Sequence, residues 1–361
     1  MSVSSEPAHW LALAYNCDLK LERVKAIVFA WCLSAGRPLS TLFSSLSEAS
    51  QTIELTELEK KAIQHAGKQA PAWQQELSVL AEEGIQLILR SEPDYPAKMA
   101  NSMPAAAQPL FLFVRGDKSL LNQVSLGVIG GTADNDDLET RGLELGALLA
   151  EEGMIVHTGL SQGVGKSVVE GALSTPGGRA IVTLPMGIRG INPDGAIEVG
   201  LDNGSLLVVS PFPPNAPFTG QRAEARYQLI SRMSQGMLYF GDNETNVASD
   251  TAVMALEQGH FVWVWDDETQ DSAIRQQVEK VTEAGGLPLT ELSDILEMIE
   301  ALIEQDLGVA VHEVLPEGPA PEAPEQVEPI DPQATLALLT QAGRVPESLT
   351  RRLRKRQTDN T

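Results

Sequence analysis

A Gly-Lys-Ser triplet at residues 165–167 is the feature of this sequence that most directly suggests chemistry. In a Walker A loop the triplet follows a glycine by four residues, because the loop must curl until consecutive backbone N–H groups point at one phosphate. Here Leu160 occupies the position of that glycine, and Gly159 comes one residue too early. The spacing argues against a nucleotide-hydrolysing P-loop. What remains is a strand, a glycine-rich turn and a helix N-terminus, which together favour anion binding.

Two arginines and one lysine are placed to help in such binding. Arg222 and Arg226 are four residues apart on a predicted helix, so both guanidinium groups lie on one face and can clamp successive phosphates. Lys166 stands at a predicted helix start, where its charge opposes the helix dipole unless an anion is present. The alternative for the arginines is an ion pair with Glu224 or with a neighbouring acidic loop. The residue types alone leave both roles open.

No set of residues assembles an enzyme mechanism. The five histidines are scattered, and only His157 lies near a predicted strand end, where a hydrogen-bonded core histidine is the expected role. Cys17 and Cys32 lack metal-ligand spacing, which indicates packed thiols in a reducing compartment. The TPGG segment at 175–178 is similar to the phosphate loop of lysine-decarboxylase-like nucleoside hydrolases, but the Gly-Thr and glutamate that those enzymes need do not follow it. We expect no catalysis, no metal and no cofactor.

The elements that must position these residues form a regular series from about residue 125 onward. Short apolar segments rich in β-branched residues alternate with amphipathic segments of helical length. This alternation predicts an α/β fold with a doubly wound, Rossmann-like, mainly parallel sheet, whose ligands bind beyond the carboxyl ends of the strands. The predicted strands are SLGVIGG, MIVHTG, RAIVTLP, SLLVVSP, GMLYFGD and FVWVWD, and the predicted helices span 137–152, 166–174, 221–234 and 249–258.

The remaining segments give the domain organisation. Helical spacing of apolar residues from about 8 to 66 predicts a small helical module over residues 1–73. The Rossmann-like domain is expected over 74–305, opening with the strands GIQLILR and PLFLFVRG and closing with a helix over 290–305. Residues 306–332 are rich in Pro and Glu and are expected to form a disordered linker, because they cannot bury enough apolar surface to fold. Residues 333–361 are expected to form a short helical tail with a basic cluster at 351–356.

The chain is acidic, with 26 Lys and Arg against 49 Asp and Glu and a formal net charge of -23 over 361 residues. Because the phosphate backbone attracts proteins through Lys and Arg, this balance argues against indiscriminate nucleic-acid binding while permitting a local basic pocket. The first residues lack both the charged and the apolar region of a signal peptide, and no later apolar run approaches the length of a membrane span. We expect a cytoplasmic protein without membrane contact.

Residues from about Trp10 to Asp266 resemble, in order, the DNA-processing protein A family (DprA, also called Smf). The resemblance includes the helical module, the DYP segment at 94–96, LFVRGD at 112–117 and the whole strand–helix series. It implies an extended Rossmann-like domain that binds single-stranded DNA and helps to load the RecA recombinase during natural transformation. The winged helix found at the C-terminus of many members is expected to be absent or vestigial, since no wing-like pair of strands follows the linker.

The family's first two signature motifs are matched only in part. Members show Gly-Ser-Arg after the first strand of the series, where this chain has Gly130, Gly131 and Thr132. Their turn of Ser-Gly-Leu-Ala-x-Gly-Ile-Asp corresponds to residues 158–165, with Gly165 in place of the aspartate. The near-P-loop is therefore similar to the glycine turn of the family.

The later motifs are weaker. The Phe-x-x-Arg-Asn-Arg segment, which supplies phosphate contacts in the family, keeps one arginine as Arg226, while Tyr227 and Gln228 replace the rest. Thr251 and Ala252 match a Thr-Ala pair that follows a Ser-Gly-Ser in the family. The residues and the resemblance together predict a DNA- or phosphate-binding site made of Gly130, Gly131, Thr132, Gly159, Gly163, Gly165, Lys166, Arg222, Arg226 and Thr251.

Two functions remain open at this point. The first is a DprA-like recombination mediator that binds single-stranded DNA, with RecA and a second copy of the chain as further partners. The second is a diverged sensor or scaffold, whose strand-end pocket binds a nucleotide or phosphate ligand, or nothing. The glycines do not decide between them, because tight turns between strand and helix need glycine with or without a ligand. The lost arginine and the net charge favour the second function, and the extent of the resemblance favours the first.

Overall fold

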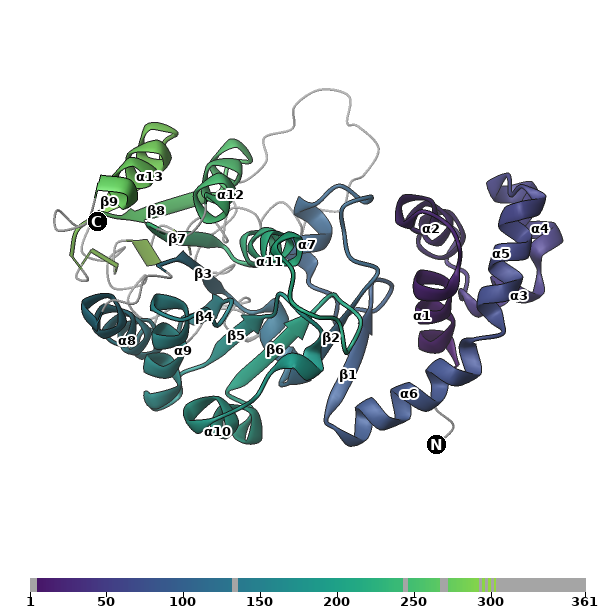
Figure 1. The fold of residues 1–361 in the computed structure, drawn as a ribbon, viewed down its shortest axis with the longest axis horizontal. Helices are drawn as coiled ribbons and strands as arrows, with labels where there is room; N and C mark the ends of the chain where they lie inside the picture. The colour runs from purple at the N-terminus through teal and green to yellow at the C-terminus, as the bar shows by residue number, and fades with distance from the viewer. Residues whose placement is uncertain are drawn as a thin grey trace, which may run out of the picture. The chain divides into compact units, whose positions relative to one another are not determined.

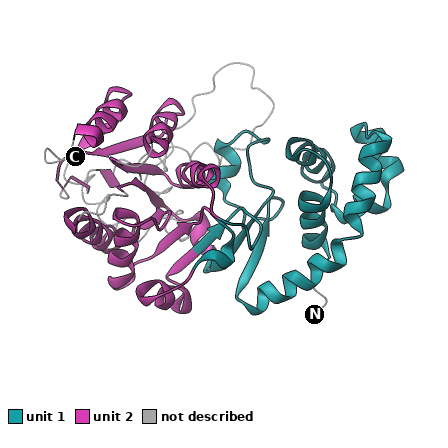
Figure 2. Ribbon diagram, in the orientation of Figure 1, with its two compact units in different colours: residues 1–118, 186–191, 208–217 teal, residues 119–185, 192–207, 218–361 magenta. Residues whose placement is uncertain are grey.

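The computed structural model describes residues 5–131, 136–242, 246–266, 272–291, 294, 295, 298, 299 and 302. The predicted linker and tail lie outside these residues, as do Thr132 and most of the helix expected over 290–305. The chain divides into two compact units, drawn in different colours in Figure 2. Unit 1 comprises residues 1–118, 186–191 and 208–217, and unit 2 comprises residues 119–185, 192–207 and 218–361.

Unit 1 opens with the predicted helical module. Its core includes Trp10 and Trp31, both buried as expected of aromatic residues at helical spacing. Trp73 is partly buried and donates a hydrogen bond from Nε1 to Asn16 Oδ1 at 2.6 Å. The helices are α1 (Glu6–Asn16), α2 (Leu21–Val28), the π-helical segment η1 (Phe29–Ser34), α3 (Ser40–Ser44), α4 (Leu46–Ile53), α5 (Glu57–Gly67) and α6 (Ala70–Glu82).

Two predicted strands follow this module in unit 1. Strand β1 (Ile85–Leu89) pairs antiparallel with β2 (Phe111–Gly116), and α7 (Ala97–Ser102) lies between them in the chain. The boundary predicted at residue 73 falls inside α6, so the helical segment continues directly to the first strand.

Unit 2 carries the strand–helix series. The strands are β3 (Ser125–Gly130), β4 (Ile155–Thr158), β5 (Ala180–Thr183), β7 (Gly236–Phe240), β8 (Phe261–Trp265) and β9 (Leu287–Leu289), while β6 (Leu206–Ser210) begins in unit 2 and ends in unit 1. The sheet order is β1-β2-β6-β5-β4-β3-β7-β8-β9. The pairs β3–β4, β4–β5, β3–β7, β7–β8 and β8–β9 are parallel, which confirms the doubly wound, mainly parallel sheet.

The order of the strands places the topological switch between β3 and β7. From β3 the chain proceeds outward through β4, β5 and β6, and it then returns to β7 and proceeds the other way. Helices α8 (Asp136–Glu151), α9 (Val164–Ser174) and α10 (Gly195–Asn203) pack on one side of the strands of unit 2 in Figure 1. Helices α11 (Gly220–Met233), α12 (Val247–Glu257) and α13 (Ser272–Glu283) pack in succession on the other side.

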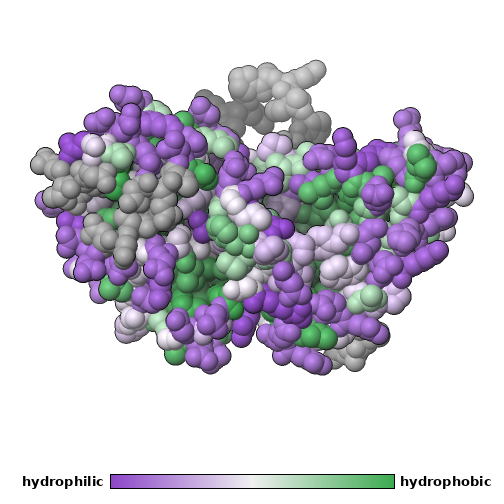
Figure 3. All heavy atoms as spheres, viewed as in Figure 1, coloured by the Kyte–Doolittle hydropathy of each residue, from purple (hydrophilic) through white to green (hydrophobic). Residues whose placement is uncertain are grey.

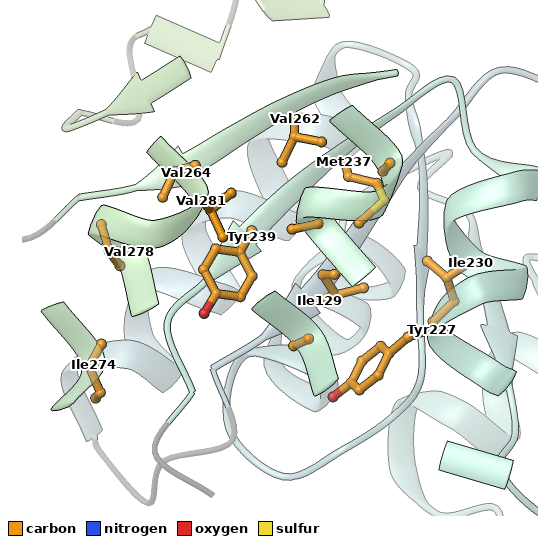
Figure 4. Packing of buried hydrophobic residues seen from close by; sticks show 13 residues of the cluster. Ile129, Tyr227, Ile230, Met237, Tyr239, Val262, Val264, Ile274, Val278 and Val281 are labelled. Atoms are coloured by element: carbon orange, nitrogen blue, oxygen red, sulfur yellow. The ribbon is translucent and has the colours of Figure 1, made fainter. Parts of the chain in front are cut away.

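A buried apolar cluster joins this second helical layer to the sheet (Figure 4). Each fully buried Val, Ile or Met side chain contributes about 1.5–3 kcal/mol relative to exposure, so the cluster fixes the three helices on the strands. Helix α11 contributes Tyr227 and Ile230 to the cluster, and Ile230 packs over Gly127 of β3. The members are Ile129, Tyr227, Ile230, Met237, Tyr239, Ala248, Ala252, Ala255, Val262, Val264, Ile274, Val278 and Val281.

The face of the molecule drawn in Figure 3 is mostly polar. Hydrophilic residues cover most of the face seen in Figure 3, and apolar residues form small patches between them. In the part of the chain that the structure describes, no helix combines the length and the apolar character needed to cross a bilayer.

Candidate functional site

The carboxyl ends of β3 and β7 meet at two glycines. Gly130 has a φ of 83°, and a Cβ atom there would lie 1.8 Å from the carbonyl oxygen of Phe240. Gly131 has a φ of 63°, and its Cβ atom would lie 2.7 Å from Cγ2 of Val164 at the start of α9. The Val164 N–H donates to the Gly131 carbonyl at 3.1 Å. Both glycines are therefore required by the packing of the switch point itself.

The turn after β4, residues 159–163, has an unusual backbone. Leu160 adopts a φ of 56°, one of two positive values among the described non-glycine residues, which costs about 1–2 kcal/mol for an L-amino acid. Gly163 is the N-cap of α9 with a φ of 81°. The Lys166 N–H donates to Ser161 O at 2.9 Å, and the Ser167 N–H donates to Gly163 O at 3.2 Å. The turn is thus held against the first turn of the helix.

Arg226 of α11 reaches this turn. Its side chain is 6% exposed, and its Nη1 donates to the carbonyl oxygen of Gly159 at 3.3 Å. Its Cζ lies 4.3 Å from the centre of the Tyr227 ring, within the range of a cation–π contact. A Cβ atom at position 159 would lie 2.6 Å from Arg226 Nε, so glycine is required there by the arginine. Nε is buried and has no hydrogen-bond partner among the described residues.

The other predicted cations are placed differently. Lys166 is the third residue of α9 rather than its first, and its ammonium group pairs with Glu170 at 3.5 Å with both side chains partly exposed. Arg222 lies one turn before Arg226 on α11 and is half-buried. Its backbone N–H donates to the Oγ1 atom of Thr219, the N-cap residue. The structure supplies Lys166 with an acidic partner that the sequence interpretation did not consider.

The remaining predicted residues divide into two groups. Gly165 lies in the first turn of α9, where a Cβ atom would have only ordinary contacts, the nearest being Thr158 Oγ1 at 3.4 Å. Thr251 is buried on α12, and its hydroxyl donates to Val247 O in its own helix at 2.8 Å. The structure brings together Gly130, Gly131, Gly159, Gly163, Gly165 and Arg226 around β3, β4, α9 and α11, whereas the Thr251 hydroxyl is hydrogen-bonded within α12.

The sequence interpretation missed two polar residues at this edge. The Tyr227 hydroxyl is hydrogen-bonded to Ser161, and burial raises the pKa of Tyr227 against the opposing effect of Arg226. Asp242, at the end of β7, is buried, and its charge adds to the rise in the pKa of Tyr227. Their joint position follows from the meeting of α11, β4 and β7, which no local pattern encodes.

The first turn of α8 adds negative charge to the same edge. It contains Asp136, Asp137 and Glu139, which suit a helix N-terminus because they complement the dipole. Gly142, further along α8, lies against the first turn of α9, where its Cβ atom would be 3.4 Å from Val164 Cα. Asp136 is six residues earlier, about 9 Å along the helix axis. Glu139 is only three residues before Gly142, about 4.5 Å along the axis, so it is the carboxylate of this turn nearest to the α9 N-terminus. The Debye length at physiological salt is about 8 Å.

The described residues contain no metal-binding cluster, because no group of three His, Cys, Asp or Glu side chains among them could hold a metal ion. His157 is fully buried on β4, with Nδ1 at 3.1 Å from Ser234 Oγ and Nε2 at 2.8 Å from Thr183 Oγ1. Burial lowers its pKa to about 3. The imidazole is thus a neutral core group.

Comparison with known sequences identifies relatives of this chain. The model of the family described as "DNA recombination-mediator protein A" matches residues 86–300, more than half of the chain. Protein Smf of Escherichia coli (strain K12) is 26% identical over 224 residues, which cover 61% of this chain and 58% of the relative. DNA processing protein DprA of Bacillus subtilis (strain 168) is 24% identical over 223 residues, which cover 61% of this chain and 74% of the relative. The match thus spans less than two thirds of Smf.

Two solved structures share the fold. DNA processing protein A of Streptococcus pneumoniae superposes with a TM-score of 0.63 at 17% identity, covering 82% of this chain and 98% of that one. DNA processing protein A of Helicobacter pylori, studied for its single-stranded DNA binding mode, superposes with a TM-score of 0.50 at 16% identity, covering 60% of this chain and 95% of that one. At this identity both comparisons concern the fold, and they agree with the doubly wound sheet described above.

Proposed function

This chain belongs to the DNA recombination-mediator protein A family, and on that premise we propose that it binds single-stranded DNA at the carboxyl ends of β3 and β4. The observation that carries the proposal is the meeting of the glycine turn at 159–163 with the N-terminus of α9 and with Arg226 of α11 at one edge of unit 2. Ligands of doubly wound sheets bind at this edge, next to the switch point.

The proposed site consists of the predicted residues of this edge. Lys166 and the half-buried Arg222 are accessible enough to meet phosphate oxygens, and a helix N-terminus adds a favourable field for an anion. We assign the chain a non-catalytic role in DNA uptake and recombination, in which it would hand the strand to RecA and act as a homodimer. These partners rest on the family alone.

The test is the binding of a fluorescent oligothymidylate to the full chain at several salt concentrations. If phosphates are bound, log affinity falls linearly with log salt, because counterions are released from the DNA. Lys166→Ala and Arg222→Ala should each weaken binding for all sequences and reduce the salt slope by about one. Lys60→Ala is the matched control, since Lys60 also forms an intrahelical ion pair, with Glu57 in unit 1.

The outcomes separate this site from others. An affinity that does not depend on salt would rule out a phosphate site. Unchanged binding in both variants, with loss of binding after deletion of residues 351–356, would assign the interaction to the basic tail, which lies outside the described residues.

The acidic first turn of α8 gives a second prediction. At a separation of about 8 Å in water, each carboxylate opposes one phosphate charge by about 0.5 kcal/mol. Neutralising all three, as Asp136→Asn, Asp137→Asn and Glu139→Gln, should therefore tighten oligothymidylate binding by about tenfold at low salt. The gain should shrink as salt is added.

The control for this prediction neutralises exposed acids elsewhere in unit 2. Glu257→Gln at the end of α12, with Glu279→Gln and Glu283→Gln in the second half of α13, removes three negative charges as the test set does. An equal gain in both sets of variants would show that only the total charge of the chain matters.

The same acidic turn favours a second candidate function. A site with one buried arginine and three nearby carboxylates suits a small phosphate ligand better than a polyanion, which points to a diverged nucleotide or phosphate sensor or scaffold. Calorimetric titration with adenosine monophosphate and with inorganic phosphate tests it. Binding of either ligand, combined with no binding of oligothymidylate, would favour this function over the first.

A further inference from the structure

The turn at 159–163 is held from outside by two consecutive residues of α11. Arg226 Nη1 binds the carbonyl oxygen of Gly159, and the Tyr227 hydroxyl is hydrogen-bonded to Ser161. Between these two anchors stands Leu160 with its left-handed backbone. A non-glycine residue keeps such a conformation only where its surroundings over-determine it. The two α11 side chains supply that constraint on either side of Leu160.

Arg226 is placed to act on the turn rather than on a ligand. Its side chain is 6% exposed, packed against the Tyr227 ring and fitted into the space over Gly159, where any Cβ atom would collide with Nε. Lys166 of α9 is 42% exposed by comparison. A phosphate reaching the buried guanidinium would have to displace the turn that the guanidinium holds.

We propose that Arg226 and Tyr227 are positioning residues that keep the 159–163 turn in its binding shape, and that Arg226 does not itself contact the ligand. The inference rests on the proposed function for the identity of the ligand, while its structural half concerns the turn alone. On this inference the direct phosphate contacts come from Lys166, Arg222 and the 159–163 turn.

The first test uses the salt slope as the readout that distinguishes the two roles. A residue that contacts phosphate loses about one unit of slope when it is replaced by alanine. For Arg226→Ala we expect weaker oligothymidylate binding with an unchanged slope. If the released turn is competent about a tenth of the time, the affinity falls about tenfold.

Two further variants separate the position of the guanidinium from its charge. Gly159→Ala places a Cβ atom 2.6 Å from Arg226 Nε and so displaces the arginine while leaving its charge in the chain. It should match the loss seen in Arg226→Ala, and the double variant should add little to either, since both break one contact. Tyr227→Phe keeps the ring under Arg226 and removes the hydroxyl, which is hydrogen-bonded both to Ser161 and to Arg226. It should weaken binding in the same way with the slope intact. Gly220→Ala, on the same helix with no atom within 4 Å of the added Cβ, is the control.

The second test needs no ligand. The Lys166 amide, bonded to Ser161 O, reports on the turn by hydrogen exchange, and the Asp250 amide, bonded to Asn246 O, reports on α12 in the same unit. Arg226→Ala and Tyr227→Phe should speed exchange at Lys166 while exchange at Asp250 stays at the wild-type rate. Global unfolding would speed both.

These measurements can overturn the inference independently of the proposed function. A slope reduced by about one in Arg226→Ala, with unchanged exchange at Lys166, would make Arg226 a direct ligand of phosphate and end the inference. If the wild-type chain does not bind oligothymidylate, the proposed function fails, and the exchange rates alone then decide whether α11 holds the turn.

Discussion

Gly146→Ala is expected to lower the free energy of unfolding by about 3 kcal/mol, the upper part of the range for overpacking, because it forces two helix backbones apart. A Cβ atom at this position of α8 would lie 2.1 Å from the carbonyl oxygen of Val168 and 2.8 Å from the backbone nitrogen of Ala172. Both atoms belong to the backbone of α9, so no side chain can rotate away to make room. Alanine has a helix propensity better than glycine by about 1 kcal/mol, and the loss is expected in spite of that gain.

The reciprocal contact gives a second variant at the same interface. Gly171 lies on α9, and its added Cβ atom would be 2.1 Å from the carbonyl oxygen of Leu143 on α8. Gly171→Ala should therefore destabilise the chain by a similar amount. Urea denaturation of each full-length variant, followed by circular dichroism, measures the change.

Gly220→Ala is the control for both, because its Cβ atom would have nothing within 4 Å. Its free energy of unfolding should stay within about 0.5 kcal/mol of the wild-type value, the range of ordinary surface substitutions. Wild-type stability in Gly146→Ala and Gly171→Ala would mean that α8 and α9 do not approach as closely as the structure shows.

The stability of the chain should fall by about 2 kcal/mol between about pH 7.5 and pH 5 because of His157. Burial lowers the pKa of this imidazole to about 3, from an ordinary value of 6.5. Well above pH 6.5 the imidazole is neutral in both the folded and the unfolded chain, so its full contribution to the free energy of unfolding is present. Below that value the unfolded chain binds a proton that the folded chain excludes, so stability is lost progressively until about pH 3.

The pH window lies above the range in which carboxylates with a lowered pKa affect stability. Glu59, whose pKa is lowered to about 2 chiefly by its hydrogen bond with Arg23, affects stability only below its ordinary value of 4.5. His157→Gln retains an amide donor and acceptor between Ser234 and Thr183 and removes the titration.

Urea denaturation at pH 7.5 and pH 5 measures the free energy of unfolding. Between these pH values it should fall by about 2 kcal/mol less in His157→Gln than in the wild type. In the wild-type chain, the NMR signals of the His157 ring should stay at their neutral positions down to pH 5, which checks the premise even if the variant does not fold. A ring that titrates near pH 6.5 would contradict it.

The elements of unit 2 could be read largely from the sequence because their signals are local. Apolar runs with β-branched residues gave the strands, and the alternation with helices gave the parallel sheet that the structure has. The helix α13 was missed although Ile274, Val278 and Val281 have helical spacing, so its signal was available. Helix α10 was missed because its sequence signal is weak: it contains two glycines and little apolar pattern.

The sequence predicted the position of the candidate site but not the roles of its residues. The sequence indicated that glycine turns and cationic residues would gather at the carboxyl ends of the strands, because all parallel strands end at one edge. It offered both Arg226 and Lys166 as phosphate contacts and favoured Arg226, which alone retains an arginine of the family motif. The structure separates them, with Arg226 buried on Gly159 and Lys166 partly exposed beside Glu170.

The sequence by itself determined which segments become strands and helices, where the turns with glycine fall and which family the chain resembles. Those properties depend on backbone preferences and on periodicities within about ten residues, which are written into consecutive positions. The tertiary structure alone decided which side chains are exposed and which are buried, and that α11 would hold the turn after β4. Burial, charge pairing and close backbone contact arise between residues far apart in the chain, such as Gly159 and Arg226, and no local pattern contains them.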